Sequence, residues 1–219
     1  MGLPRRRQNV KKYKNYKSYK KWLREDFEYR CCYCSIHEND YGGYWHFHVD
    51  HYRPKGLPCF AHLITDYSNL LYSCDQCNVL KGDIWPSDNP LVDGCGWLDP
   101  CEHDLRKHYY YAYENGDFRL ITVTIVGRWM ARVLGLDQLP RMTLRRDLVE
   151  DERVDLELYD TLGKLLEHSQ KKYEERSTDE QLVEINLIQQ ALSKLRNRIE
   201  KKYEPKPFVS VHRRSGDIL

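Results

Sequence analysis

Residues 73–83 read SCDQCNVLKGD, in which an asparagine follows directly on the second cysteine of a C-x-x-C pair. Another such pair, Cys31 and Cys34, lies upstream, and 39 residues separate it from Cys74 and Cys77. Two pairs supply the four thiolates that close a tetrahedral structural zinc site. A thioredoxin-like redox role needs only one pair at the start of a helix, so the sequence predicts that these four cysteines bind structural Zn²⁺.

The other thiols have no comparable pattern. Cys32 lies beside a predicted ligand, but only Cys31 has the two-residue gap to Cys34. Three further cysteines, together with His103, match no metal-binding spacing, so we expect buried or loop thiols whose role stays open: Cys59, Cys95 and Cys101.

Length and composition indicate a globular chain. Its 219 residues are 41% apolar and include five tryptophans, which is enough for one domain or two small ones. The first residues lack the apolar core of a signal peptide, and the longest apolar run, LITVTIV at 120–126, is too short to span a bilayer. We therefore expect a cytoplasmic protein without a membrane partner, in whose reducing surroundings cysteines bind metals or stay free.

Charge is distributed unevenly along the chain. Residues 1–24 hold ten of the 35 Lys and Arg and no acid, so the remaining 25 bases face 33 acids, a net charge of −8. A basic arm of this kind is either a solubilising tail or a contact for a polyanion such as nucleic acid. Tyrosines at a spacing of three predict a basic helix through about Phe27, and the candidate nucleic-acid contacts there are Lys11, Lys12, Lys14 and Lys17.

Three regions follow from these patterns: a basic N-terminal helix or arm at 1–28, a Cys/His-rich core at 29–108, and a C-terminal region at 109–219. In the core, YWHFHV predicts a short strand that ends at Asp50 and His51, and CNVLKG predicts a helical turn stopped by Gly82. His46 and His48 alternate with Asp50. They are expected to pack beside Trp45, and an approach to the metal ion or the substrate is the alternative.

The C-terminal region has a hairpin signal and then a helical period. Two β-rich runs between 109 and 125 flank Asn115-Gly116. Leucine and isoleucine spacings predict a helix at 154–173, with Leu158, Leu162 and Leu165 on its core stripe, and a second at 178–203. Ser177 and Glu180 form a capping-box pattern before the second helix, and the two helices are expected to pair as a helical hairpin.

Between the cysteine pairs lie HVDHYRPK at 48–55 and YSNLLYSC at 67–74, which hold Asp50, His51 and Asn69. The chain contains, in this order, the motifs Cys-x-x-Cys, Asp-His, Asn-Leu and Cys-x-x-Cys-Asn-x-x-Lys-Gly. This set of motifs resembles that of the HNH endonucleases that hold a structural zinc. The resemblance covers about Cys31 to Asp83. It implies an α+β fold: a small zinc-bound ββα-metal core, with the basic helix, the β-hairpin and a helical C-terminal half added to it.

Carried over by position, the resemblance implies a role for each polar residue of the motif. His51 would be the general base that activates water, and Asp50 a ligand of a divalent cation. Asn69 would brace the loop, and Asn78, where many members have a histidine, would be the second ligand. Two oxygen donors fit Mg²⁺ or Mn²⁺ better than zinc. Two further candidates for phosphate contact are Arg53 and Lys81.

The chemistry of phosphodiester hydrolysis agrees with these roles. It needs a base of near-neutral pKa, which histidine provides, and a positive charge at the leaving oxygen, which a carboxylate-held metal ion provides. Neighbouring residues of a regular strand point to opposite faces, so Asp50 and His51 can serve one site only if the strand ends or bulges there.

The whole chain has a looser resemblance to stand-alone bacterial HNH proteins of Septu-type and retron-linked anti-phage systems. This implies a defence effector acting on DNA, whose helical half docks on an ATPase partner or on a second copy. Two alternatives stay open. One is a zinc-stabilised nucleic-acid-binding or scaffold module without cleavage, and the other is a nuclease acting on RNA, such as tRNA.

Overall fold

The computed structural model describes residues 3–114 and 117–202, which fall into two compact units. The first unit comprises residues 3–112 and 119–137, and the second comprises the described residues of 113–118 and 138–202. Helices dominate, and the strands form two small sheets, β1 with β2 and β3 with β4. The predicted α+β class is therefore confirmed.

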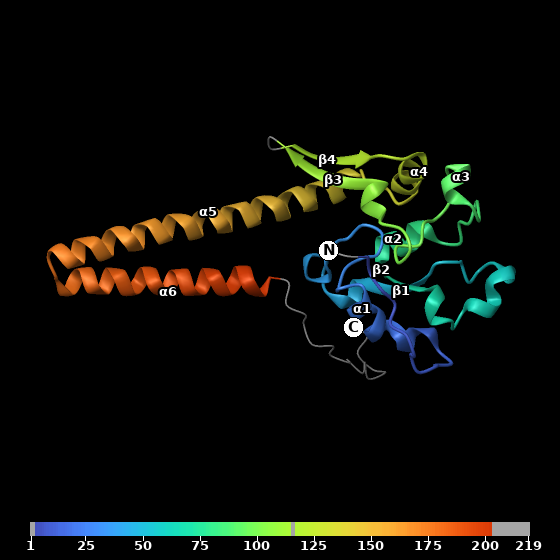
Figure 1. Ribbon diagram of the computed structural model, residues 1–219, viewed down its shortest axis with the longest axis horizontal. Helices are drawn as coiled ribbons and strands as arrows, with labels where there is room; N and C mark the ends of the chain where they lie inside the picture. Colours follow the sequence, from blue (N-terminus) through green and yellow to red (C-terminus); the bar gives the residue numbers. More distant parts are fainter. Residues whose placement is uncertain (1–2, 115–116, 203–219) are drawn as a thin grey trace, which may run out of the picture. The chain divides into compact units, whose positions relative to one another are not determined.

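The first unit contains most of the elements in Figure 1. Its α-helices and strands are α1 (Lys20–Asp26), β1 (Phe47–His51), β2 (Leu70–Cys74), α2 (Asp75–Lys81), α3 (Pro90–Asp93) and α4 (Ile125–Val133), together with residues 109–112 of β3 (Tyr109–Glu114) and residues 119–122 of β4 (Asp117–Thr122). Short 3-10 helices link them: η1 (Tyr16–Tyr19), η2 (Glu38–Asp40), η3 (Tyr44–His46), η4 (Pro58–Leu63), η5 (Tyr67–Asn69) and η6 (Leu105–Lys107).

The centre of this unit is the antiparallel pair of β1 and β2, which α2 follows without a loop. In this pair Asp50 lies opposite Leu71 and His51 opposite Leu70. Every residue of β2 is buried, as its sequence LLYSC favours. The order strand, strand, helix is the ββα arrangement that the motif predicts. The start of β1 pairs with the end of β2, and α2 then runs back to the end of β1, where Lys81 donates to the His51 carbonyl.

The N-terminal segment differs from the predicted continuous helix. Helical structure begins only at Tyr16, with η1 leading into α1, and the preceding residues take an irregular course. The Arg6 guanidinium donates to the Leu70 carbonyl and to Asp99, and Arg7 pairs with Asp26 at 2.7 Å. These contacts hold the segment against the body, so part of its positive charge is structural.

A buried ion pair ties α1 to the central strands. The Arg24 guanidinium donates to both carboxylate oxygens of Glu38, and the Tyr72 hydroxyl donates to the same carboxylate at 2.7 Å. All of these polar groups are paired, as buried charges must be. The ion pair therefore fixes α1, which carries the basic Lys20, relative to β2.

Removing Glu38 should destabilise the protein, because it leaves the Arg24 charge buried without a partner. We expect Glu38→Ala to lower the free energy of unfolding by about 3 kcal/mol or more, measured by urea denaturation. Glu25→Ala is the matched control, since Glu25 pairs with Arg7 at an exposed position and its loss should cost less than about 1 kcal/mol. Equal losses in the two variants would contradict the structural role of the buried pair.

The predicted β-hairpin is present in its strands, β3 and β4. The turn predicted at Asn115-Gly116 lies outside the described residues. Trp97 fills the core beside these elements, with its ring 5.0 Å from that of Trp129 and its indole N–H donating to the Ile84 carbonyl. A buried tryptophan with a satisfied N–H is typical of a well-formed core.

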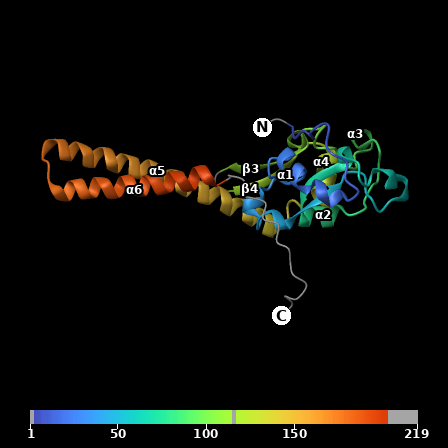
Figure 2. The same cartoon turned by 90° about the horizontal axis from the view of Figure 1, so that it is seen from below.

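The second unit is a helical hairpin of α5 (Leu139–Glu175) and α6 (Asp179–Lys201), which run side by side in Figures 1 and 2. The α5 helix begins far before the predicted residue 154, with Pro140 in its first turn, where proline is tolerated. Thr178 caps α6 by accepting from the Gln181 N–H, whereas the Ser177 hydroxyl donates to the Tyr173 carbonyl. The predicted capping box is thus shifted by one residue, and the predicted helix end at Tyr203 lies outside the described residues.

The contact between α5 and α6 uses only part of the predicted stripe of α5. Ile185, Ile188 and Leu195 of α6 are buried as expected and Leu162 of α5 is half-buried, but Leu158 and Leu165 are exposed. Polar pairs join the helices instead: Ser169 with Glu184, Tyr159 with Arg196 and Asp155 with Arg198. The spacing of leucines predicted this contact only in part, because α5 is partly polar where it meets α6.

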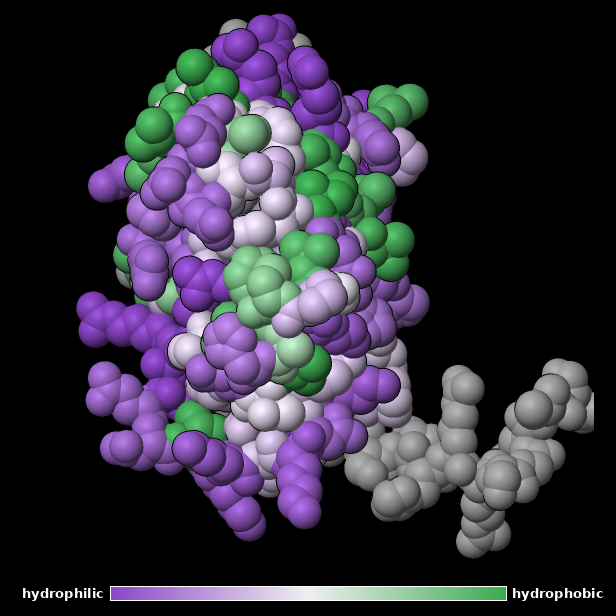
Figure 3. Space-filling view, turned by 90° about the vertical axis from the view of Figure 1, so that its right-hand side faces the viewer, coloured by the Kyte–Doolittle hydropathy of each residue, from purple (hydrophilic) through white to green (hydrophobic). Residues whose placement is uncertain are grey.

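The surface carries scattered apolar side chains. Figure 3 shows one face of the molecule, on which small apolar patches lie among polar residues. Exposed apolar residues of the first unit include Leu91, Val92 and Ile125. No helix in the described part of the chain combines the length and the apolar character that crossing a membrane requires.

Candidate functional site

Four cysteine side chains converge in the first unit. The sulfurs of Cys31, Cys34, Cys74 and Cys77 all lie within 4.8 Å of one another and are buried. A tetrahedral zinc with Zn–S bonds of about 2.3 Å holds its sulfurs about 3.8 Å apart, and the Cys34 and Cys74 sulfurs are 3.9 Å apart. The cluster could therefore bind a metal such as zinc, and these are the four cysteines that the sequence predicts.

Two local turns present these thiols. Cys31 and Cys34 lie in a tight loop after α1, closed by the Cys31 N–H donating to the Ile36 carbonyl. Cys74 ends β2, and Cys77 lies in the first turn of α2. Burial raises the pKa of the Cys77 thiol well above its ordinary value, so its thiolate needs a nearby cation, which Zn²⁺ would supply.

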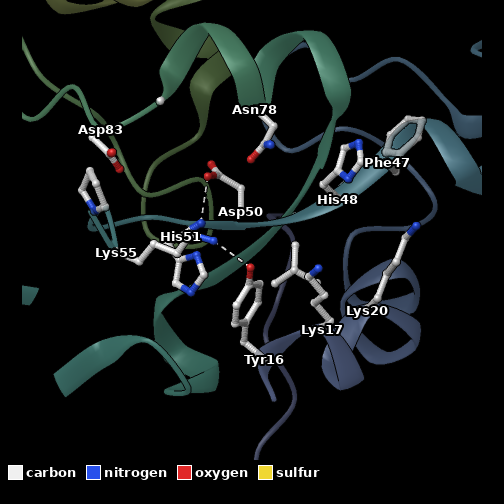
Figure 4. Close-up of a pocket in the computed structure, with 13 residues that line it drawn as sticks. Tyr16, Lys17, Lys20, Phe47, His48, Asp50, His51, Lys55, Asn78 and Asp83 are labelled. Carbon is white, nitrogen blue, oxygen red and sulfur yellow. Dashed lines mark hydrogen bonds between the residues drawn. The ribbon is translucent and has the colours of Figure 1, made fainter. Parts of the chain in front are cut away.

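A pocket of about 480 Å³ opens beside the end of β1. Figure 4 shows its lining, to which the N-terminal segment, β1 and α2 all contribute. The polar and charged residues around it are Tyr16, Lys17, Lys20, His48, Asp50, His51, Lys55, Asn78 and Asp83. Three of the four predicted motif residues, Asp50, His51 and Asn78, therefore meet in one pocket.

Asp50 is a buried carboxylate at the end of β1. The Tyr33 hydroxyl donates to one of its oxygens at 2.6 Å, and the His51 backbone N–H donates to the other at 2.8 Å. Burial raises the pKa of Asp50, against the opposing charge of Lys81 and the hydrogen bond from Tyr33. The strand ends at His51, so both side chains can reach one site, as the sequence required.

His51 is oriented by a backbone carbonyl. Its Nε2 lies 2.9 Å from the Ile64 oxygen, and since a carbonyl can only accept, Nε2 carries the proton and Nδ1 keeps its lone pair. Burial lowers the pKa of His51, against the hydrogen bond to Ile64, so the ring is neutral at pH 7. A neutral imidazole with a lone pair on Nδ1 can accept a proton from water.

The two motif asparagines have different places. The Asn78 side chain extends from α2 toward Asp50 in Figure 4. Asn69 lies away from this pocket, where its side-chain oxygen accepts from the Arg53 N–H at 2.9 Å and its amide donates to the Arg53 carbonyl at 3.1 Å. Asn69 thus braces the loop that follows β1, while Asn78 faces Asp50.

Lys81 corrects one prediction. The sequence suggested that it contacts phosphate, but its side chain is 0% exposed. Its ammonium donates to the His51 carbonyl at 2.6 Å and lies 3.6 Å from an Asp50 oxygen. Because the charge is enclosed behind the site, Lys81 supports His51 and Asp50 and is not available to a nucleic acid.

The other candidate contacts remain on the surface. Arg53 is exposed, with its guanidinium 6.0 Å from the Phe60 ring, and Lys17 lines the pocket. Lys11, Lys12 and Lys14 are exposed on the N-terminal segment. Cys59 is exposed, and Cys95 and Cys101 are partly buried outside the four-cysteine cluster.

Several residues of the site were not singled out from the sequence. Tyr33 lies between the first two ligands, yet nothing in CCYC indicates that it reaches Asp50. Tyr16 packs edge-on against the His51 ring at 4.6 Å and accepts a hydrogen bond from Lys55 at 2.7 Å. His48, by contrast, was named from the sequence: it is exposed and lines the pocket, which agrees with the alternative to packing beside Trp45.

Similarity to known proteins is limited. Septu protein PtuB of Bacillus thuringiensis is 30% identical to the chain over 142 residues, which are 63% of this chain and 46% of that protein. The chain therefore spans about half the length of the curated relative that it matches. No protein-family profile matches the sequence, and no solved structure is significantly similar to it.

Replacing one thiol of the cluster should release the metal. We expect the purified protein to contain zinc and Cys77→Ser to lose it and to unfold at lower temperature, because closing a four-thiolate site adds about 10 kcal/mol of binding energy to folding. Metal content by mass spectrometry and thermal unfolding measure both effects. Cys59→Ser, at an exposed cysteine outside the cluster, is the control and should keep its zinc. Zinc retained in full by Cys77→Ser would show that the cluster does not bind it.

Proposed function

We propose that the chain is a metal-dependent nuclease of the HNH type that hydrolyses phosphodiester bonds, with DNA as its substrate. The observation that carries this proposal is that Asp50, His51 and Asn78 line one pocket. The Ile64 carbonyl binds Nε2 of His51, which leaves the lone pair on Nδ1 available to accept a proton. The order of the three pocket residues along the chain matches the HNH motif. Their oxygen donors suit a metal ion, and the histidine nitrogen suits a base, which are the groups that such a reaction needs.

The donors at the pocket fit a hard divalent cation. The Asp50 carboxylate and the Asn78 amide oxygen are the kinds of ligand that Mg²⁺ and Mn²⁺ prefer. Because the protein supplies only a few ligands, the remaining coordination places are open to water and phosphate. When bound, such an ion supplies positive charge to the phosphate and to the leaving oxygen. Tyr33 and Lys81 hold Asp50 in place for this purpose.

His51 would act as the general base. Its Nε2–H donates to the Ile64 carbonyl, which fixes the ring, and its Nδ1 accepts the proton of the attacking water. Tyr16 packs against one side of the ring and limits its movement. These contacts position the base before substrate arrives.

A nucleic-acid substrate agrees with the charge around the pocket. Lys17, Lys20 and Lys55 surround the carboxylate and the histidine, so the approach to the site is basic. Backbone phosphates are attracted to such a surface whatever the base sequence. Arg53 and the exposed lysines of the N-terminal segment are further candidates for phosphate contact.

We further propose that the protein acts in anti-phage defence. The similarity to a Septu protein supports this role, together with the order of motif residues. The helical hairpin of α5 and α6 would then dock on a partner, for which the Septu-type resemblance implies an ATPase and a second copy of the chain is the alternative. Exposed apolar residues on α5, among them Val154, Leu158 and Leu165, support a docking role.

The nuclease proposal predicts metal-dependent nicking of plasmid DNA. With Mg²⁺ or Mn²⁺ present, we expect His51→Ala to reduce the cleavage rate by about 10²-fold or more, because it removes the general base. His62→Ala, at an exposed histidine of η4, is the matched control and should cleave as the wild type does. Thermal unfolding and zinc content establish that both variants are folded.

Equal cleavage by His51→Ala and the wild type would contradict the proposal. Salt-dependent binding without cleavage under either metal would favour the zinc-stabilised binding module instead. A mixed panel of DNA and RNA, including tRNA, tests the choice of substrate, and preferential cleavage of RNA would reassign it.

A further inference from the structure

The pocket continues beyond the proposed metal ligands. Figure 4 shows Lys20 and His48 on the opposite side of it from Lys55 and Asp83. His48 and Asp50 are two residues apart on β1, so their side chains share one face of the strand and lie about 7 Å apart along it. The proposed reaction uses the Asp50 end and gives the Lys20 end only a general attraction for phosphate.

Lys20 presents a partly dehydrated ammonium to this end of the pocket. One of its N–H groups donates to the Tyr44 carbonyl at 2.8 Å, and the nitrogen lies 4.6 Å from the centre of the Tyr44 ring. Burial lowers the pKa of Lys20 to about 8, against the charge of Glu38. An anion beside it would favour the charged form, and an ammonium has three donors to offer.

An exposed aromatic side chain packs against Tyr44, the residue that this ammonium contacts. Trp45 is 54% exposed, and its ring lies 4.3 Å from that of Tyr44 with an angle of 36° between the planes. Both belong to η3, which runs directly into β1 and therefore toward His48. A half-exposed tryptophan, joined through Tyr44 to a lysine, is the kind of surface on which an unpaired base stacks.

We propose that Lys20, His48 and Trp45 form a subsite for the nucleotide next to the cleaved phosphate. Lys20 and His48 bind the phosphate of that nucleotide, and Trp45 stacks on its base. This inference rests on the proposed function and adds a substrate class to it. Stacking on Trp45 requires a base whose face is uncovered, so the substrate is single-stranded or has an unpaired segment at the cut.

Charge and shape together favour this ligand over others. A protein partner would not need a cationic pocket that leads to a metal site, and a free phosphate would not use the exposed indole. A single strand uses both, since its backbone follows the basic groups while its bases contact the aromatic ring. Duplex DNA offers phosphates to Lys20 but covers the faces of its bases.

The test measures binding in a protein that does not cleave. A fluorescently labelled single-stranded oligonucleotide and the matching duplex are titrated into the His51→Ala protein without added Mg²⁺ or Mn²⁺. We expect Trp45→Ala to weaken binding of the single strand by about tenfold and Trp45→Phe to retain most of it. Tyr110→Ala, at an exposed aromatic residue of β3, is the control and should bind as its parent does.

Lys20 is tested in the same protein. Lys20→Met keeps the aliphatic stem and should reduce the slope of log affinity against log salt by about 0.7 for a single strand, the loss of one phosphate contact. Quenching of tryptophan fluorescence by the oligonucleotide should shrink in Trp45→Phe. Zinc content and thermal unfolding establish that each variant is folded.

The outcomes separate this inference from the nuclease proposal. Unchanged single-strand binding by Trp45→Ala, or equal losses on single strand and duplex, would overturn the subsite even if the wild type cleaves DNA. The expected binding pattern in a protein whose wild type cleaves nothing would support the subsite and contradict the nuclease proposal.

Discussion

Four cysteine sulfurs meet where β2 ends and α2 begins, and the geometry of the neighbouring pocket depends on this meeting. The loop that carries Cys31 and Cys34 is held by the buried Tyr33 ring, which contacts Trp97, and by backbone hydrogen bonds such as that from the Cys31 N–H to the Ile36 carbonyl; a metal ion among the four sulfurs would add to these contacts. With the loop and the start of α2 fixed on each other, the residues next to the cysteines acquire defined places. Asn78, directly after Cys77, is one of them.

Each of the two segments that carry the cysteine pairs also contributes a contact to Asp50. Tyr33, between Cys31 and Cys34, donates to one carboxylate oxygen, and Lys81, one turn after Cys77, lies beside the other. The buried carboxylate is thus held from two sides by residues of the two cysteine-bearing segments. A structural metal would in this way determine the position of a proposed ligand of a different ion.

Local patterns predicted much of the site. The spacing of the cysteine pairs, the strand ending at His51 and the asparagine after Cys77 are all readable over short stretches. The burial of Lys81, the bond from Tyr33 to Asp50 and the packing of Tyr16 on His51 are not, because each joins segments far apart in the sequence. For the same reason Arg6 and Arg7, read as part of a basic tail, proved to be ion-paired with Asp99 and Asp26.

The central claim is that two kinds of metal site lie side by side, with sulfur ligands in one and oxygen ligands in the other. Crystals grown with Mn²⁺ and measured at the absorption edges of zinc and manganese would test it directly. We predict a zinc peak among the four cysteine sulfurs and a separate manganese peak between Asp50 and Asn78. Manganese bound elsewhere, or Asn78 turned away from a metal that Asp50 holds, would contradict the claim.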